Sequence, residues 1–245
     1  MSETVLILGA TSAIARATAA GFAARGAALY LASRDLDAWQ RIAADLRLRY
    51  GVGVRCGVFD AEATDTHEAF FNAIITTIRP LSGVVLAFGY LGDPQAARDF
   101  RMSEKIIAIN FTGSASILSH CANYFEPLKR GFIIGISSVA GDRGRQSNYV
   151  YGAAKGALSL YLQGLRNRLF ASGVRVITIK PGFVDTAMTY GLPGMFLVAS
   201  PQKTGERIVR SLDKSADVVY LPGFWRYIML IIKHIPESIF KRMKL

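Results

Sequence analysis

Residues 5–25 read VLILGATSAIARATAAGFAAR, an apolar run followed by a glycine and an alanine-rich stretch. The run Val5 to Leu8 is short and uninterrupted, which is typical of a strand buried on both faces of a parallel sheet. The stretch Thr11 to Arg25 predicts a helix that Gly26 would stop. Gly9 falls between the two, where a tight turn favours a residue without a side chain. This strand–turn–helix order predicts the first unit of an α/β fold.

The same alternation continues to the end of the chain. Apolar runs predict further strands at 28–33, 54–59, 83–88, 131–137, 174–180 and 217–221, and helical spacing predicts helices at 36–50, 65–78, 103–124, 149–170 and 201–212. Parallel strands joined by helices need right-handed crossovers, so helices should cover both faces of the sheet. We expect a single α/β domain, a doubly wound parallel sheet over residues 1–222, with an apolar and basic helical extension at 223–245.

Composition and charge exclude several classes of protein. The chain has 245 residues, of which 51% are hydrophobic and 19% charged, so it can build a full core and is not disordered. Its net charge of +11 favours nucleic acid, an anionic membrane or an anionic ligand as partner, and no nucleic-acid-binding module is recognisable. Cys56 and Cys121 form no CxxC pair and the histidines have no HExxH spacing, so we expect neither disulfides nor a metal. No apolar run is long enough to span a membrane and no signal peptide begins the chain, which predicts a cytoplasmic protein.

Two strand ends predict a nucleotide site. The turn at Gly9, with Thr11, Ser12 and Ile14, would offer free N–H groups and a positive helix end to a phosphate, although an alanine-rich helix start alone explains it equally well. After the second strand, Ser33 replaces the carboxylate that accepts an NAD ribose, and Arg34 supplies a donor for the 2′-phosphate of NADP. We therefore expect NADP(H) in preference to NAD(H); the alternative is a solvated helix start.

A catalytic group is predicted downstream. Tyr151 and Lys155 lie at i and i+4, one turn apart on one helix face, and an ammonium there would lower the pKa of the phenol. Such a phenol exchanges a proton with a carbonyl or alcohol oxygen, which Ser138 at a strand end would hold. Asn110 lies within a predicted helix, where it needs a specific hydrogen bond. Each of these residues taken alone has an ordinary structural explanation. Their order along the chain and their positions at strand ends together favour a catalytic site.

With these residues the chain resembles the short-chain dehydrogenase/reductase family from Val5 to about Thr186. The resemblance implies a Rossmann-like fold and a catalytic tetrad of Asn110, Ser138, Tyr151 and Lys155. Tyr151 would be the proton donor in reduction, Lys155 would bind the ribose hydroxyls, and Asn110 would hold a proton-relaying water. The implied cofactor-binding residues are Gly9, Thr11, Ser12, Ile14, Ser33, Arg34, Asp60 (against adenine), Ala87, Gly89, Tyr151, Lys155, Pro181, Gly182, Val184 and Thr186.

The sequence also departs from the family pattern. The motif TGxxxGxG carries Leu8, Ala13 and Ala15 in place of threonine and the last two glycines, and NNAG is replaced by residues 86–89, LAFG. The methyl group of Ala13 falls where the backbone approaches pyrophosphate, so we expect weakened or shifted cofactor binding.

A narrower resemblance concerns residues 87–93, 141–145 and 224–240. They are similar to bacterial reductases of a 2-keto pentose carried on a polyprenyl phosphate, which work with a flavin oxidase partner. In the basic loop, Arg143 or Arg145 would contact a substrate phosphate, or the loop is simply solvated. The alternatives in function are a generic carbonyl reductase acting on a ketosteroid, ketoacyl or quinone substrate, and a non-catalytic NADP-binding sensor or scaffold.

The extension is the last feature. Apolar residues at 225–232, interrupted by Pro236 and followed by basic residues, suit a helix lying at an anionic lipid surface, at the inner face of the cell membrane. Burial against the core or in a dimer is the alternative. We expect the extension and the loop 187–200 (Met188, Leu192, Met195, Phe196, Leu197) to form an apolar entrance for a polyprenyl chain. The resemblance further implies a homodimer or homotetramer formed through the helices at 103–124 and 149–170.

Overall fold

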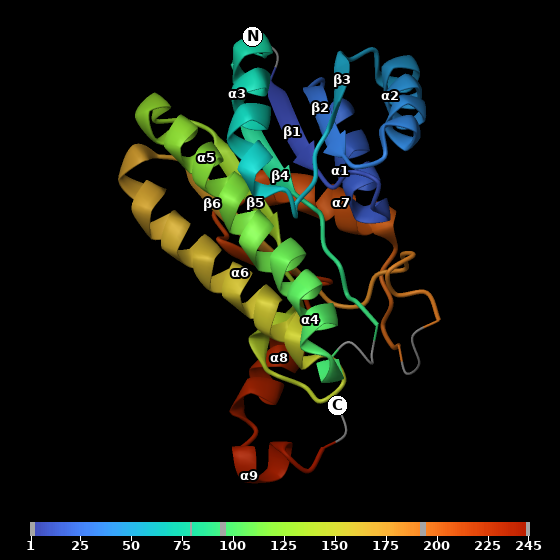
Figure 1. Cartoon of the computed structure of the whole chain (residues 1–245), viewed down its shortest axis with the longest axis vertical. Helices are drawn as coiled ribbons and strands as arrows, with labels where there is room; N and C mark the ends of the chain where they lie inside the picture. Colours follow the sequence, from blue (N-terminus) through green and yellow to red (C-terminus); the bar gives the residue numbers. More distant parts are fainter. Residues whose placement is uncertain (1–2, 79, 94–96, 192–194, 244–245) are drawn as a thin grey trace.

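A computed structural model describes residues 3–78, 80–93, 97–191 and 195–243 (Figure 1). Its centre is a seven-stranded sheet in the order β3-β2-β1-β4-β5-β6-β7, and every neighbouring pair is parallel. The strands are β1 (Thr4–Leu8), β2 (Ala28–Ser33), β3 (Val54–Val58), β4 (Gly83–Leu86), β5 (Phe132–Ile136), β6 (Arg175–Pro181) and β7 (Val218–Leu221). The strand order reverses between β1 and β4, and ligands of open α/β sheets bind at this switch point.

Helices cover both faces of the sheet, as predicted (Figure 1). One apolar core lies under α3 (His67–Thr77), α5 (Gly113–Leu128) and α6 (Tyr149–Leu169). The other lies under α1 (Ala13–Ala23), α2 (Leu36–Tyr50) and α7 (Pro201–Arg210). The central strands β1, β4 and β5 are buried along their whole length. The apolar runs of the sequence therefore mark strands because both of their faces meet a helix layer.

Polar side chains begin the helices that approach the carboxyl edge of the sheet. Ser12, Asp35 and Ser200 accept hydrogen bonds from backbone N–H groups in the first turns of α1, α2 and α7. Each side chain satisfies a donor that the helix itself leaves free. These caps fix where α1 and α2 start, and hence where the two loops of the predicted nucleotide site lie.

The helix predicted at 103–124 is present, but it is longer and contains a π-helical turn that was not predicted. The structure has α4 (Phe100–Ile107), a π-helical turn η3 (Ala108–Thr112) and α5. The side-chain amide of Asn110 donates to the carbonyl of Ile106 at 2.8 Å and also reaches the segment after β4. These contacts accompany the wider turn, and π-turns of this kind occur frequently at functional sites.

The C-terminal extension forms α8 (Trp225–His234) and α9 (Glu237–Phe240). One face of α8 is buried, since Trp225 and Met229 form a third apolar cluster with Val139 in the loop after β5. The opposite face exposes Tyr227 and Leu230. The extension is thus attached to the loop that carries Ser138. None of the described helices is both long and apolar enough to cross a membrane.

Candidate active site

The end of β5 is pinned to α6 by three hydrogen bonds. Ser137 Oγ donates to the carbonyl of Lys155 at 2.9 Å and shares a 2.7 Å bond with Ser159 Oγ. In return Lys155 Nζ donates to the carbonyl of Ile136 at 3.1 Å. This fixes the register of the strand end against the first turns of α6. As a result Ser138 lies beside Tyr151, with which its side chain is hydrogen bonded.

Asn110 and Lys155 meet at Gly89, in the segment after β4. A methyl group placed on Gly89 would lie 3.0 Å from Asn110 Oδ1 and 3.3 Å from Lys155 Nζ. Both side chains are almost completely buried. Gly89 therefore lets the backbone approach the two polar groups closely. Together with the contact of Tyr151 and Ser138, the structure brings the four residues of the predicted tetrad to one edge of the sheet.

Burial determines the protonation states at this site. It raises the pKa of Tyr151 to about 12, although the hydrogen bond with Ser138 acts in the opposite direction. It also lowers the pKa of Lys155 to about 8. The Lys155 ammonium lies 5.9 Å from the centre of the Tyr151 ring. The predicted lowering of the Tyr151 pKa by Lys155 is therefore wrong: desolvation raises this pKa above its ordinary value, so the phenol is neutral near pH 7.

The turn after β1 has the shape of a phosphate-binding loop. Gly9 has φ +78°, and a Cβ on it would lie 2.4 Å from Phe88 Cβ, so only glycine fits. Ser12 caps α1, while Thr11 and Ile14 are partly exposed beside the helix start. Arg16 holds the loop by donating to the carbonyl of Thr11 at 3.1 and 3.2 Å. The free first N–H groups of α1 fit a pyrophosphate.

Two neighbouring residues at the end of β2 have different roles: Ser33 is structural, and the Arg34 guanidinium is accessible. Ser33 is buried and its hydroxyl accepts from the indole N–H of Trp39 and from the N–H of Asp35. Arg34 is 63% exposed and has one ion-pair partner, Glu62, at 3.8 Å. Glu62 is shared with Lys105 at 3.6 Å. Glu62 would compete with the 2′-phosphate of NADP for Arg34. The sequence did not predict this ion pair, because the two residues follow different strands.

Asp60 follows β3 and shapes its loop by accepting from the N–H of Glu62 at 3.0 Å. Its carbonyl is 2.9 Å from Nε2 of His67, whose Nδ1 is 2.9 Å from Ser116 Oγ. His67 is fully buried against Phe59, and burial lowers its pKa. The sequence analysis did not identify His67 as a residue that positions the Asp60 loop. The one indication in the sequence is its place among apolar residues of a predicted helix.

The segments after β4 and β6 form the rest of the candidate site at the carboxyl edge of the sheet. The N–H of Ala87 donates to the carbonyl of Leu8 at 2.9 Å, and Phe88 packs against Phe59 with ring centres 5.6 Å apart. Pro181, the last residue of β6, is buried, and a methyl on Gly182 would lie 1.9 Å from Nε1 of Trp225.

The loop after Pro181 and Gly182 is fixed by local contacts. Val184 forms an isolated bridge with Ala199, and the N–H of Thr186 donates to Thr189 Oγ1 at 3.1 Å. The residues predicted to meet the nicotinamide end therefore lie in a shaped, partly buried loop.

The two arginines predicted to meet a substrate phosphate have different environments. Arg143 donates to the carbonyls of Ile232, Lys233 and Ile235, at 2.7 to 3.0 Å, so its guanidinium caps the end of α8. This arrangement favours a structural role for Arg143. Arg145 is partly buried and contacts Met229 Sδ at 3.3 Å.

Comparison with known proteins agrees with this geometry. The model of the short chain dehydrogenase family matches residues 3–193. An uncharacterized oxidoreductase from Mycobacterium tuberculosis is 33% identical over 240 residues, which cover 98% of this chain and 96% of that protein. A serine 3-dehydrogenase from Agrobacterium fabrum is 32% identical over 194 residues, covering 77% of this chain and 75% of that enzyme. The structure of a short-chain dehydrogenase from Sphingobium yanoikuyae in complex with NADPH aligns with TM-score 0.81 and 24% identity, covering 96% of this chain and 97% of that one.

The chain therefore belongs to the short-chain dehydrogenase family. It is an NAD(P)-dependent oxidoreductase with the family's Rossmann-like sheet. The fold and enzyme class predicted from the sequence are confirmed.

Proposed function

We propose that this protein reduces a ketone to a secondary alcohol with NADPH, and that the ketone is a 2-keto pentose carried on a polyprenyl phosphate. The observation that carries the reductase assignment is that Asn110 and Lys155 meet at Gly89, while Tyr151 lies beside both Lys155 and Ser138. In this assignment the protein resembles decaprenylphosphoryl-2-keto-ribose reductase, and a flavin oxidase would supply the ketone.

The protonation state of Tyr151 suits reduction. A neutral Tyr151 phenol can give its proton to a carbonyl oxygen, whereas oxidation would need the phenolate. Ser138 Oγ would hold that oxygen, and Lys155 would bind the ribose hydroxyls and return a proton to the phenol. Asn110 would hold the water that relays protons to Lys155. The bound nicotinamide supplies the hydride that goes to the carbonyl carbon.

The preference for NADPH rests on the end of β2. Ser33 places no carboxylate there, and the largely exposed Arg34 guanidinium is available for the 2′-phosphate. Asp60 would contact the adenine. Val184 and Thr186 would line the carboxamide and phosphate region.

The lipid carrier is supported by an apolar surface beside the site. On α8 the side chains of Tyr227, Leu230 and Ile231 are exposed, at i, i+3 and i+4. In the loop after β6, Phe196 is half exposed and its ring lies 5.5 Å from that of Trp225. Of the apolar residues predicted to line the entrance, Met188, Phe196 and Leu197 are exposed and Met195 is partly exposed, while Leu192 lies outside the described residues.

This surface would bring the enzyme to the inner face of the cell membrane. Basic side chains at Arg226 and Lys233 flank it and suit anionic lipid. We also propose a homodimer or homotetramer formed through α5 and α6, where Leu160 on α6 and Phe170 directly after it are exposed.

The activity test is NADPH oxidation with a panel of ketones that includes the polyprenyl-linked keto pentose. Tyr151→Phe should lower kcat by roughly 10²–10⁴-fold, because the proton donor is lost, while NADPH binding persists. Turnover of the lipid-linked sugar above all other ketones supports the substrate. Preference for a ketosteroid, ketoacyl compound or quinone identifies a generic carbonyl reductase, and equal rates for both proteins on every ketone identify a non-catalytic NADP-binding protein.

The membrane test is liposome flotation. Truncation before Phe224 would also remove the buried Trp225 and Met229, so a triple substitution of Tyr227, Leu230 and Ile231 to serine is the sharper variant. It should lose binding to vesicles containing phosphatidylglycerol. Leu48→Ser, at an exposed leucine on α2, is the matched control and should float like the wild type. Equal flotation of the triple variant and this control would contradict the membrane contact.

A further inference from the structure

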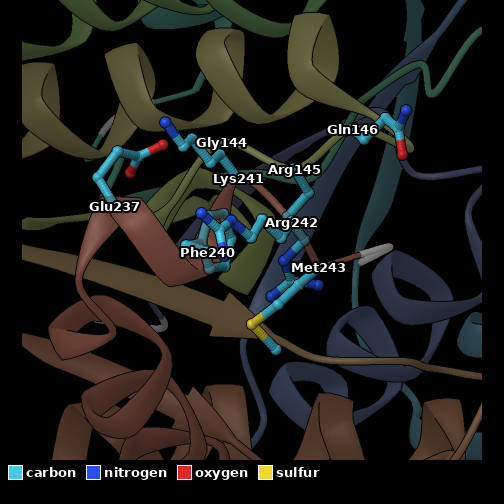
Figure 2. A pocket seen from close by; sticks show the side chains of 8 residues that line it. All are labelled: Gly144, Arg145, Gln146, Glu237, Phe240, Lys241, Arg242 and Met243. Atoms are coloured by element: carbon cyan, nitrogen blue, oxygen red, sulfur yellow. The ribbon is translucent and has the colours of Figure 1, made fainter.

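A pocket of about 400 Å³ lies between the loop 144–146 and the C-terminal residues 237–243 (Figure 2). Neither the catalytic tetrad nor the loop after β6 contributes to its lining. Arg145 lines one side and Lys241 and Arg242 line the other, beside the apolar Phe240 and Met243. The pocket is therefore a concave site with three basic side chains outside the catalytic centre.

The positive charge of this pocket is not neutralised by its one acidic member. Glu237 is paired with Arg143 at 2.9 Å, and the Arg143 guanidinium lies 3.9 Å from the centre of the Phe240 ring. Among the ion pairs recorded for the described residues, none includes Arg145, Lys241 or Arg242. Since like charges repel, gathering three cations in one hollow is unfavourable unless an anion joins them.

Arg145 is the strongest indication of a ligand. Its Nε is buried and has no hydrogen-bond partner within the described part of the chain. Its Nη2 meets only the sulfur of Met229, a weak acceptor, at 3.3 Å. Burial lowers its pKa and outweighs the opposite effect of the Asp142 charge, so the charged form is disfavoured. A charged donor held in this way is normally satisfied, so an acceptor from outside the chain is expected.

Arg143, two residues earlier in the same loop, makes the contrast clear. Its guanidinium is fully engaged with three carbonyls and with Glu237. It thereby fixes α9 against the loop and frames the pocket. One arginine of the loop builds the pocket wall, and the other lines the pocket with a guanidinium whose Nε has no hydrogen-bond partner among the described residues.

We propose that this pocket binds a phosphate group, as a mono- or diester, with the Arg145 guanidinium as its main donor and Lys241 and Arg242 in support. A planar guanidinium matches two phosphate oxygens at once, and the ammonium adds a point charge. The phosphate belongs either to a soluble metabolite or to a lipid headgroup. This binding does not require redox turnover, so it can hold or fail separately from the proposed reductase activity.

Calorimetry with sn-glycerol 3-phosphate tests the soluble source, and flotation with phosphatidylcholine vesicles, with and without phosphatidylglycerol, tests the lipid source. The variant is Arg145→Met, and the control is Arg41→Met, which removes the same charge from an exposed position on α2. Loss of one charge-assisted contact should weaken binding by about tenfold or more in Arg145→Met and leave Arg41→Met unchanged.

Binding of either probe that is lost in Arg145→Met alone supports the pocket and identifies its source. Equal weakening in the two variants would show a general charge effect and overturn the proposal. Failure of the wild type to bind either probe would overturn it as well.

Thermal unfolding gives a second readout that does not depend on the choice of probe. Without added phosphate, Arg145→Met should have a melting temperature equal to or above that of the wild type, because it removes a partly buried charge that has no ion pair among the described residues and keeps an apolar contact with Met229. A clear drop would mean that the guanidinium serves the fold rather than a ligand, which contradicts the proposal. Glycerol 3-phosphate should raise the melting temperature of the wild type and not that of the variant.

Discussion

Asn110 binds both polar groups of the Tyr90 backbone: its Nδ2 donates to the Tyr90 carbonyl at 2.6 Å, and its Oδ1 accepts from the Tyr90 N–H at 3.2 Å. The same Nδ2 donates to the carbonyl of Ile106. The π-turn η3 thus joins α4 to the segment after β4. Gly89, the residue before Tyr90, is where Asn110 and Lys155 converge, so this contact sets the geometry of the site.

Asn110→Ala should therefore impair both folding and catalysis. Two backbone carbonyls and one N–H lose their partner, and leaving a buried group unsatisfied costs about 1–3 kcal/mol of unfolding free energy. We expect lower stability in urea and a fall in kcat/KM that exceeds the fall in NADPH affinity.

The matched control for this variant is Asn123→Ala. Asn123 lies exposed on α5, where it accepts from Arg168 at 2.8 Å, so its loss should change stability and activity little. An Asn110→Ala protein indistinguishable from this control would show that the clamp on Tyr90 has no role in the site.

The pH dependence of reduction should follow Lys155 rather than Tyr151. Because the pKa of Lys155 is lowered to about 8, the ammonium is present below that pH and lost above it. Tyr151 keeps its proton until about pH 12. We expect kcat/KM for the ketone to be level below about pH 8 and then to fall about tenfold per pH unit. A profile level up to pH 10 would contradict this assignment.

Lys155→Met should give a more stable but inactive protein. In the unfolded chain the lysine has its ordinary pKa of 10.5, so burying the charged form costs about 3 kcal/mol at pH 7. Between about pH 8 and 10.5 the unfolded chain binds more protons, so wild-type stability rises with pH while that of the variant does not. The difference in unfolding free energy should shrink from pH 7 to pH 10. A variant less stable than the wild type at pH 7 would contradict the burial cost.

Cofactor choice should respond to Arg34 and Glu62 in opposite directions. Arg34→Ala removes the donor for the 2′-phosphate and should weaken NADPH binding by about 10- to 100-fold, with NADH unchanged. Glu62→Gln releases Arg34 from an exposed ion pair, and should tighten NADPH binding by about two- to fivefold. Fluorescence titration of both cofactors measures this. Equal losses for NADPH and NADH in Arg34→Ala would refute the NADPH preference.

The fold was predictable because its signals are local. A strand buried on both faces is an unbroken apolar run, as in β1, β4 and β5, and the alternation with helices dictates a parallel sheet. The i, i+4 spacing of Tyr151 and Lys155 likewise carries its own geometry.

The features that the sequence did not reveal depend on contacts between distant segments. The π-turn at Asn110 involves Tyr90, the capping of α8 involves Arg143, and the competition for Arg34 involves Glu62. The protonation of Tyr151 depends on how much water the fold excludes, which no spacing encodes.

Trp225 connects the C-terminal extension to the loop after β6. It is 1% exposed, its ring lies 5.8 Å from that of Phe183 and 5.5 Å from that of Phe196, and Gly182 faces its Nε1. The loop after β6 is thus supported by α8. Trp225→Ala would leave a cavity below this loop, which typically costs about 3–5 kcal/mol, and should reduce cofactor affinity along with stability.

Trp225→Phe separates ring packing from the indole N–H. That N–H is buried without a partner among the described residues, so replacing it by an apolar ring should leave stability within about 1 kcal/mol of the wild type and preserve activity. Tyr227→Ala, on the exposed face of the same helix, should change neither quantity. Urea unfolding and NADPH titration of the three variants test this. If Trp225→Ala kept wild-type NADPH affinity while losing stability, the extension would serve the fold alone. Because Gly182, a predicted cofactor-binding residue, packs on this ring, we expect affinity and stability to fall together.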